Sequence, residues 1–183
     1  MGRRTTATVA ALAGVVLLAS GCGSETDGKA TPSTGVGTSA ATAALWDPCT
    51  QISDQVLQKV GVVPATKESG ISGVQQPGWK VCSWHDRQSG WNYSLGVWST
   101  TNTVDDFQKK SENTNFSDIS IAGRSGVTYH RMNDKDGEDC DLLFPAAQGA
   151  VLITAFNTAA GAGVAPCDRA RAAAETLVPL FPR

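Results

Sequence analysis

The sequence predicts an α+β domain in which an antiparallel β-sheet of about six strands has helices packed on one face. Three observations predict this class: short segments in which apolar and polar residues alternate, helix-start patterns at three places, and the order α-β-β-α-β-β-β-β-α along the chain. With 183 residues, of which 41% are hydrophobic, the chain can build one such domain with a real core, and hardly two.

The three helices are predicted from their first turns. Ser53 can cap a short helix, and Ile52 can pack against Leu57 across its first turn. Thr103 begins a second helix with a capping-box pattern, and Pro166 occupies the first turn of a third. Spacing along this last helix puts four apolar residues on one face, namely Ala170, Ala174, Leu177 and Val178.

Six strands are predicted between these helices. They are Trp79–His85, 91–98, Ser117–Ile121, Gly126–Arg131, Asp139–Phe144 and Ala150–Phe156. Successive side chains of a strand point to opposite faces of its sheet. On the second strand, we therefore expect Trp91 to share a face with Leu95 and Val97, and Trp98 to share the other face with Asn92.

The amino terminus is predicted to be a lipoprotein signal peptide, residues 1–21. Arg3 and Arg4 precede an apolar segment shorter than the ~20 residues of a spanning helix, and small residues then lead to Cys22. This segment resembles the bacterial lipobox, which implies cleavage after Gly21 and acylation of the Cys22 thiol. We expect a lipid-anchored protein on the extracytoplasmic face of the cell membrane. N-terminal myristoylation and twin-arginine export are alternatives with less support from the surrounding residues.

Residues 22–44 are predicted to be the lipidated cysteine and a flexible linker, because Gly, Ser, Thr, Ala and Pro dominate and no aromatic residue occurs. Residues 45–183 then form the single globular domain. Removal of residues 1–21 takes away two arginines, which leaves 15 − 2 = 13 basic against 17 acidic side chains. That mildly acidic balance argues against a nucleic-acid partner, which requires clustered Lys and Arg.

Four cysteines remain in the exported domain once Cys22 is assigned to lipid. An even number in an oxidising compartment favours disulfides, and three pairings exist. We expect Cys49 to pair with Cys82 and Cys140 with Cys167, each bridge tying a helix start to a strand. A metal site is the weaker alternative, because there is no C-x-x-C pair and only His85 and His130 remain to complete one.

Several short motifs of the domain together resemble a known family. They are Trp46-Asp47-Pro48-Cys49, Gln76-Pro77-Gly78-Trp79, Cys82-Ser83-Trp84, Cys140 and Pro166-Cys167. With these motifs the chain resembles the actinobacterial lipoprotein family known as domain of unknown function 3558. The resemblance implies an envelope-anchored, disulfide-containing α+β domain without an assigned activity, and a Mog1/PsbP-like fold is a looser expectation. It supplies no catalytic residue.

Motifs for catalysis or cofactor binding are not found in the sequence. No G-x-S-x-G segment lies between a strand and a helix, and no phosphate-binding glycine loop is present. One loop is rich in acidic residues, but its spacing does not fit a calcium-binding loop, so we interpret it as a solvated turn; its residues are Asp134, Asp136, Glu138, Asp139 and Asp141. We therefore predict no catalytic residue, no metal ligand and no cofactor.

The remaining chemical signal is aromatic, because five tryptophans are many for such a domain. An exposed tryptophan beside polar groups can stack on a sugar ring, a lipid headgroup or a protein partner. Trp84, Trp98 and Asn92 are the candidate binding residues. The sequence favours a non-enzymatic module that binds an envelope protein or a small ligand. The alternatives are an enzyme or enzyme regulator acting on envelope polymer, and a structural surface protein.

Overall fold

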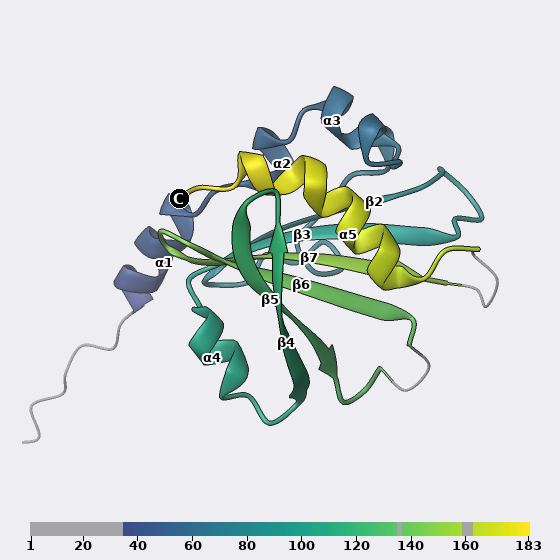
Figure 1. Cartoon of the computed structure of the whole chain (residues 1–183). Coiled ribbons are helices and arrows are strands. Elements are labelled where there is room, and N and C mark those ends of the chain that lie inside the picture. The colour runs from purple at the N-terminus through teal and green to yellow at the C-terminus, as the bar shows by residue number, and fades with distance from the viewer. Residues whose placement is uncertain (1–34, 135–136, 159–162) are drawn as a thin grey trace, which may run out of the picture. The chain divides into compact units, whose positions relative to one another are not determined.

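The computed structural model describes residues 35–134, 137–158 and 163–183, and within them the chain forms one seven-stranded antiparallel sheet with helices against it (Figure 1). The strand order is β1-β2-β3-β7-β6-β5-β4. The strands are β1 Glu68–Ser69, β2 Trp79–His85, β3 Tyr93–Thr100, β4 Asn113–Ile121, β5 Arg124–Arg131, β6 Asp139–Ala146 and β7 Gly149–Asn157. The predicted α+β class is confirmed, with one strand more than expected. The additional strand, β1, has only two residues, too few for an alternating pattern to be visible.

The helices of the described chain are α1 Gly35–Ala44, α2 Pro48–Gln51, α3 Asp54–Lys59, α4 Val104–Gln108 and α5 Pro166–Leu177, with 3₁₀ turns at Pro64–Thr66 and Val178–Leu180. The predicted caps are confirmed. The hydroxyl of Ser53 accepts a hydrogen bond from the N–H of Val56, and Thr103 forms a capping box with Asp106. None of the helices in the described residues is long and apolar enough to cross a membrane.

Helix α1 differs from the prediction for its segment, which was a flexible linker as far as residue 44. Its ten residues contain four alanines, and alanine has the highest helix propensity of all residues. The prediction considered only whether the segment could form a core of its own. The hydroxyl of Thr42 accepts a hydrogen bond from the N–H of Gly78, 2.6 Å away, so the helix is attached to the domain.

The two faces of the sheet are covered unequally. Helices α2, α3 and α5 lie on one face, where the larger core contains the buried residues Trp84, Val97, Phe144, Ile153 and Leu177. The short helix α4 lies on the opposite face (Figure 1), where Phe107 packs over a smaller cluster that includes Tyr129, Leu143 and Leu152. Helix α4 covers only one end of that face.

Both predicted disulfides are confirmed. Cys49 is bonded to Cys82 across 33 residues and ties α2 to β2, while Cys140 is bonded to Cys167 across 27 residues. The second bridge holds the first turn of α5 against β6. Both bridges therefore fasten the helical layer to the same face of the sheet.

We predict that the double substitution Cys140→Ser with Cys167→Ser lowers the free energy of unfolding by about 3 to 4 kcal/mol, because the unfolded chain regains the entropy of a loop of this length. Urea denaturation of the oxidised proteins measures the difference. Under reducing conditions the variant and the parent should differ far less. Equal denaturation midpoints for the two oxidised proteins would show that this bridge does not stabilise the fold.

Candidate functional site: a trough across the sheet

A row of small or polar residues crosses the sheet on the face opposite α5. The strand register places Glu68 beside Ser83, Ser83 beside Gly96, Gly96 beside Thr154, and Thr154 beside Asp141. This row spans five strands, and adjacent strands lie ~4.8 Å apart, so it extends for about 19 Å. It forms the floor of a depression that crosses the strand direction.

Bulkier residues stand on both sides of this floor. Val81, Trp98 and Leu152 form one neighbouring row, and the other contains His85, Ser94 and Phe156. The two rows are four residues apart along each strand, or about 13 to 14 Å between their Cα atoms. They enclose a cavity of about 240 Å³, whose lining includes Ser83, Ser94, Gly96, Trp98, Thr154 and Phe156. We call this depression the trough.

The indole of Trp98 lies over the floor of the trough at Gly96. A Cβ atom on Gly96 would come within 2.6 Å of the Trp98 Nε1 atom, so a larger residue at this position would displace the ring. Trp79 contacts the indole edge-on, with ring centroids 6.1 Å apart. The Nε1 atom is buried and has no hydrogen-bond partner. A buried N–H without an acceptor costs about 1 to 3 kcal/mol.

One end of the trough is closed by an ion-pair network. The Nε atom of Arg131 donates to the Oδ2 atom of Asp141 at 2.7 Å, and its NH2 group lies 3.2 Å from Asp139. The hydroxyl of Thr154 donates to the other carboxylate oxygen of Asp141 at 2.6 Å. Burial raises the pKa of Asp141, although Arg131 acts in the opposite direction. The charge of Arg131 is thus shared between two carboxyl groups, while Glu68 adds a third at the other end.

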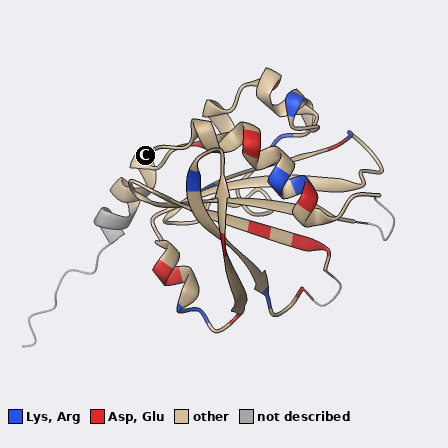
Figure 2. Ribbon diagram, viewed as in Figure 1, with Lys and Arg blue, Asp and Glu red and all other residues tan. Residues whose placement is uncertain are grey.

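The charge distribution of the ribbon agrees with this acidic character. Two acidic residues lie on β6, at the end of the trough, while other acidic and basic residues are distributed over the remaining elements (Figure 2). The acidic loop was predicted to be solvated, and for Asp141 this was wrong, because its side chain is 1% exposed and bound to Arg131. Asp136 lies outside the described residues. Among the described residues, no group of three or more His, Cys, Asp or Glu side chains is arranged to hold a metal ion.

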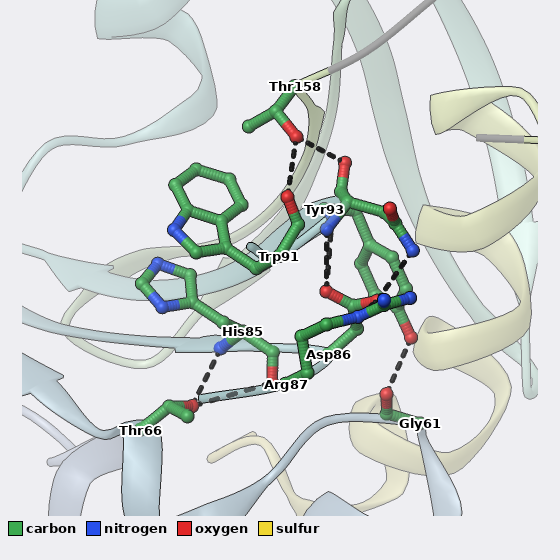
Figure 3. Close-up of polar contacts among 9 residues, drawn as sticks. Gly61, Thr66, His85, Asp86, Arg87, Trp91, Tyr93 and Thr158 are labelled. Atoms are coloured by element: carbon green, nitrogen blue, oxygen red, sulfur yellow. Dashed lines mark hydrogen bonds and ion pairs between the residues drawn. The ribbon is translucent and has the colours of Figure 1, made fainter. Parts of the chain in front are cut away.

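Two stacked rings form an aromatic ridge along the other side of the trough (Figure 3). The rings of His85 and Trp91 are nearly parallel, with an interplanar angle of 6° and centroids 4.2 Å apart. Trp91 also contacts Phe156, at 6.3 Å between centroids. We call His85, Trp91 and Phe156 the aromatic ridge. Beyond it lies a second, wide hollow of about 510 Å³, which is lined by Thr66, His85 and Trp91 and shares Glu68 with the trough.

Asp86 holds the turn that carries the ridge. Its carboxylate accepts hydrogen bonds from the backbone N–H of Asn92 at 2.8 Å and from the Asn92 side-chain amide at 3.0 Å. The hydroxyl of Thr158 donates to the carbonyl of Trp91 at 2.8 Å (Figure 3). Burial alone would raise the pKa of Asp86, but hydrogen bonds from Asn92, Tyr93 and Arg87 outweigh it and lower that pKa.

The candidate binding residues have different positions in the structure. Trp98 lies on the face opposite Leu95 and Val97, as predicted, and lines the trough. Trp84 is fully buried in the larger core, on the face covered by helices, so a ligand in solvent cannot reach it. Asn92 is engaged by Asp86, so its amide supports the turn and does not line the trough.

The predicted face of Trp91 was wrong. Strand β3 begins at Tyr93, and the chain bends at Asn92, so the alternation of the strand does not extend to residue 91. The ring instead lies against His85, on the trough side of β2. Sequence analysis missed Gly96, Thr154 and Phe156. A glycine inside a strand often marks a place where another group approaches the backbone closely. Gly96 is such a glycine, so this residue could have been noticed from the sequence.

These features define a small disulfide-bonded α+β domain with an acidic, aromatic-sided trough on one sheet face. The chain matches the family model described as "Protein of unknown function (DUF3558)" over residues 17–180, and it therefore belongs to this family. The resemblance inferred from the cysteine and tryptophan motifs is thus confirmed. No curated protein and no solved structure matches the chain. The Mog1/PsbP-like fold stays a prediction.

We predict that Asp86→Asn destabilises the domain by about 1 to 3 kcal/mol at pH 7, because the charge-assisted hydrogen bonds to the turn are weakened. The pKa of Asp86 in the folded protein lies below the ordinary value of 3.8, so its contribution is fully present above about pH 4 and is lost as the pH falls from there through the lowered pKa of the folded protein. Urea denaturation of both proteins from pH 3 to 7 measures this. A difference that stays constant at every pH would contradict the assignment.

Proposed function

We propose that the protein is an extracytoplasmic binding module, tethered to the membrane by lipid on Cys22, whose ligand lies in the trough. The proposal rests on the trough itself, in which Trp98 and Phe156 stand on opposite sides of a floor of small and polar residues. A concave surface with aromatic sides and a few convergent polar groups is the usual form of a ligand site. Cys22, the signal peptide and the first part of the linker lie outside the described residues, so the anchor rests on the lipobox-like sequence.

The chemistry of the trough favours binding over the alternative of an enzyme acting on envelope polymer. A hydroxyl nucleophile needs an adjacent base that is free to take its proton. The hydroxyl of Thr154 donates to Asp141, and that carboxylate is already bound by Arg131. The ring of His85 is stacked on Trp91 in the ridge. The Thr154 hydroxyl and the Asp141 carboxylate thus already have partners, while the aromatic sides of the trough offer surfaces suited to recognition.

We predict that Cys22→Ser leaves the domain folded but releases it from membranes, because the acyl chains that hold it have no attachment point. Membrane fractions washed with carbonate and probed for the protein measure retention, and circular dichroism of the released protein checks the fold. The parent protein should stay with the membrane after the same wash. Retention of the variant to the same extent would overturn the lipid anchor.

We predict that a photo-crosslinking side chain at the edge of the trough captures the ligand in the native envelope. Ile71 lines the trough and is 43% exposed, and Leu180 is a matched control at 39% exposure that does not line it. Each is replaced in turn by p-benzoylphenylalanine. Adducts should form from position 71 and not from position 180, because only the first lies beside the ligand.

The dependence of the adduct on Trp98 separates ligand capture from random contact. Trp98→Ala in the Ile71 crosslinking variant should remove the adduct, while circular dichroism reports whether the fold persists. Trp98→Phe, which keeps a ring, serves as the milder substitution if the alanine variant unfolds. Identical adducts from positions 71 and 180, or an adduct that survives every change at Trp98, would mean that the trough is not the binding site.

A further inference from the structure

The direction and width of the trough do not fit two common kinds of peptide ligand. A peptide strand binds a sheet through the free backbone groups of an edge strand. The floor residues Ser83, Gly96 and Thr154 instead lie on strands that are paired with one another, and the trough runs across them. An α-helix is about 10 to 12 Å wide. It does not fit between rows whose Cα atoms are about 13 to 14 Å apart and whose side chains include Trp98 and Phe156.

The charge of the trough disfavours the binding of an anionic ligand. Arg131 is held by Asp139 and Asp141, so its guanidinium does not present an uncompensated positive charge to a ligand. Glu68 lies at the opposite end of the same row. A phosphate, sulfate or uronate group in the trough would therefore meet more carboxyl groups than cations, and like charges repel strongly where water is excluded.

The remaining chemistry fits an uncharged ring that carries hydroxyl groups. The rings of Trp98 and Phe156 offer apolar surfaces on opposite sides of the floor, suited to the C–H faces of a sugar. The hydroxyl of Ser83 can donate and accept, and the hydroxyl of Thr154, which donates to Asp141, can still accept. A sugar hydroxyl can pair with both of these side chains, while its apolar ring face lies against the aromatic sides of the trough.

The length of the row suits a chain of such rings. From Glu68 to Thr154, the last floor residue that lines the cavity, the floor crosses four strands and extends for about 14 Å. The cavity of about 240 Å³ is smaller than the roughly 300 to 1,000 Å³ of drug-sized ligand pockets, so it encloses only the central part of such a chain. The hollow beyond the aromatic ridge shares Glu68 with the trough and gives the chain a place to continue.

We infer that the ligand of the trough is a segment of an uncharged glycan that lies across the strands, with one sugar ring between Trp98 and Phe156. This inference rests on the proposed function, because it assumes that the trough is the binding site. It adds the class of ligand and its direction across the sheet. The Trp98 indole contacts the enclosed ring from one side, and the aromatic ridge supports the part of the glycan next to it.

The test is a titration of the full chain, purified in detergent, with neutral tetra- to hexasaccharides of glucose, mannose, galactose, arabinose and N-acetylglucosamine. Among the indole N–H resonances of the five tryptophans, that of Trp98 is identified by its loss in Trp98→Phe. At least one oligosaccharide should shift this resonance. The same oligosaccharide with a primary hydroxyl oxidised to a carboxylate should bind more weakly, because of the acidic groups of the trough.

Two variants and a control test the position of the ring. Trp98→Ala removes one side of the trough, and Gly96→Ala displaces the indole, so each should weaken binding by about tenfold or more. Phe116→Leu is the control, since Phe116 packs on Tyr129 and does not line the trough. Its affinity should equal that of the parent. Equal losses in all three variants would assign the effect to general destabilisation and overturn the inferred position.

The outcomes distinguish this inference from the proposed function. If no neutral oligosaccharide shifts the Trp98 resonance at millimolar concentration, while the Ile71 adduct still depends on Trp98, the glycan is wrong and the binding site stands. A lysine-rich peptide titrated in the same way, and found to bind, would identify the class that replaces it. Loss of both the shift and the adduct would overturn the inference and the proposed function together.

Discussion

The register between β3 and β7 is the constraint on which the trough depends. Pairing of Gly96 with Thr154 puts two small residues at the centre of the floor, and a slip by one residue would turn the side chains of one strand to the other face. The larger core prevents this slip, because Val97 and Ile153 are fully buried on the helical side. The site on one face is therefore positioned by packing on the other.

The two faces of the sheet therefore differ in composition. On the helical face, α5 and both disulfides fasten a continuous apolar layer to the sheet. In the part of the chain that the structure describes, the other face has the short helix α4 at one end, and its remaining surface carries polar and aromatic groups. An unpaired N–H at Trp98 costs stability, and it can be tolerated because the opposite face supplies most of the buried apolar surface.

The sequence predicted the strands and the bridges better than the site. Alternation located β2 and β5 to β7, and the correct cysteine pairs were chosen from three possible pairings because each bridge would tie a helix start to a strand. Alternation also separates the two faces of a strand, but it does not say which face the helices cover. Trp84 and Trp98 were therefore equivalent candidates until the structure showed one in the core. The floor could not be predicted, because it joins residues from five strands whose pairing no local pattern specifies.

The close approach of the Trp98 indole to Gly96 has a consequence for how this family can diverge. Any side chain at position 96 would occupy the space of the ring, so a relative with a larger residue there needs a smaller one at position 98. The two positions should then exchange as a pair, and each exchange would alter the width and depth of the trough. The shape of the trough could thus vary among relatives through two codons with one codon between them, while the scaffold around them stayed unchanged.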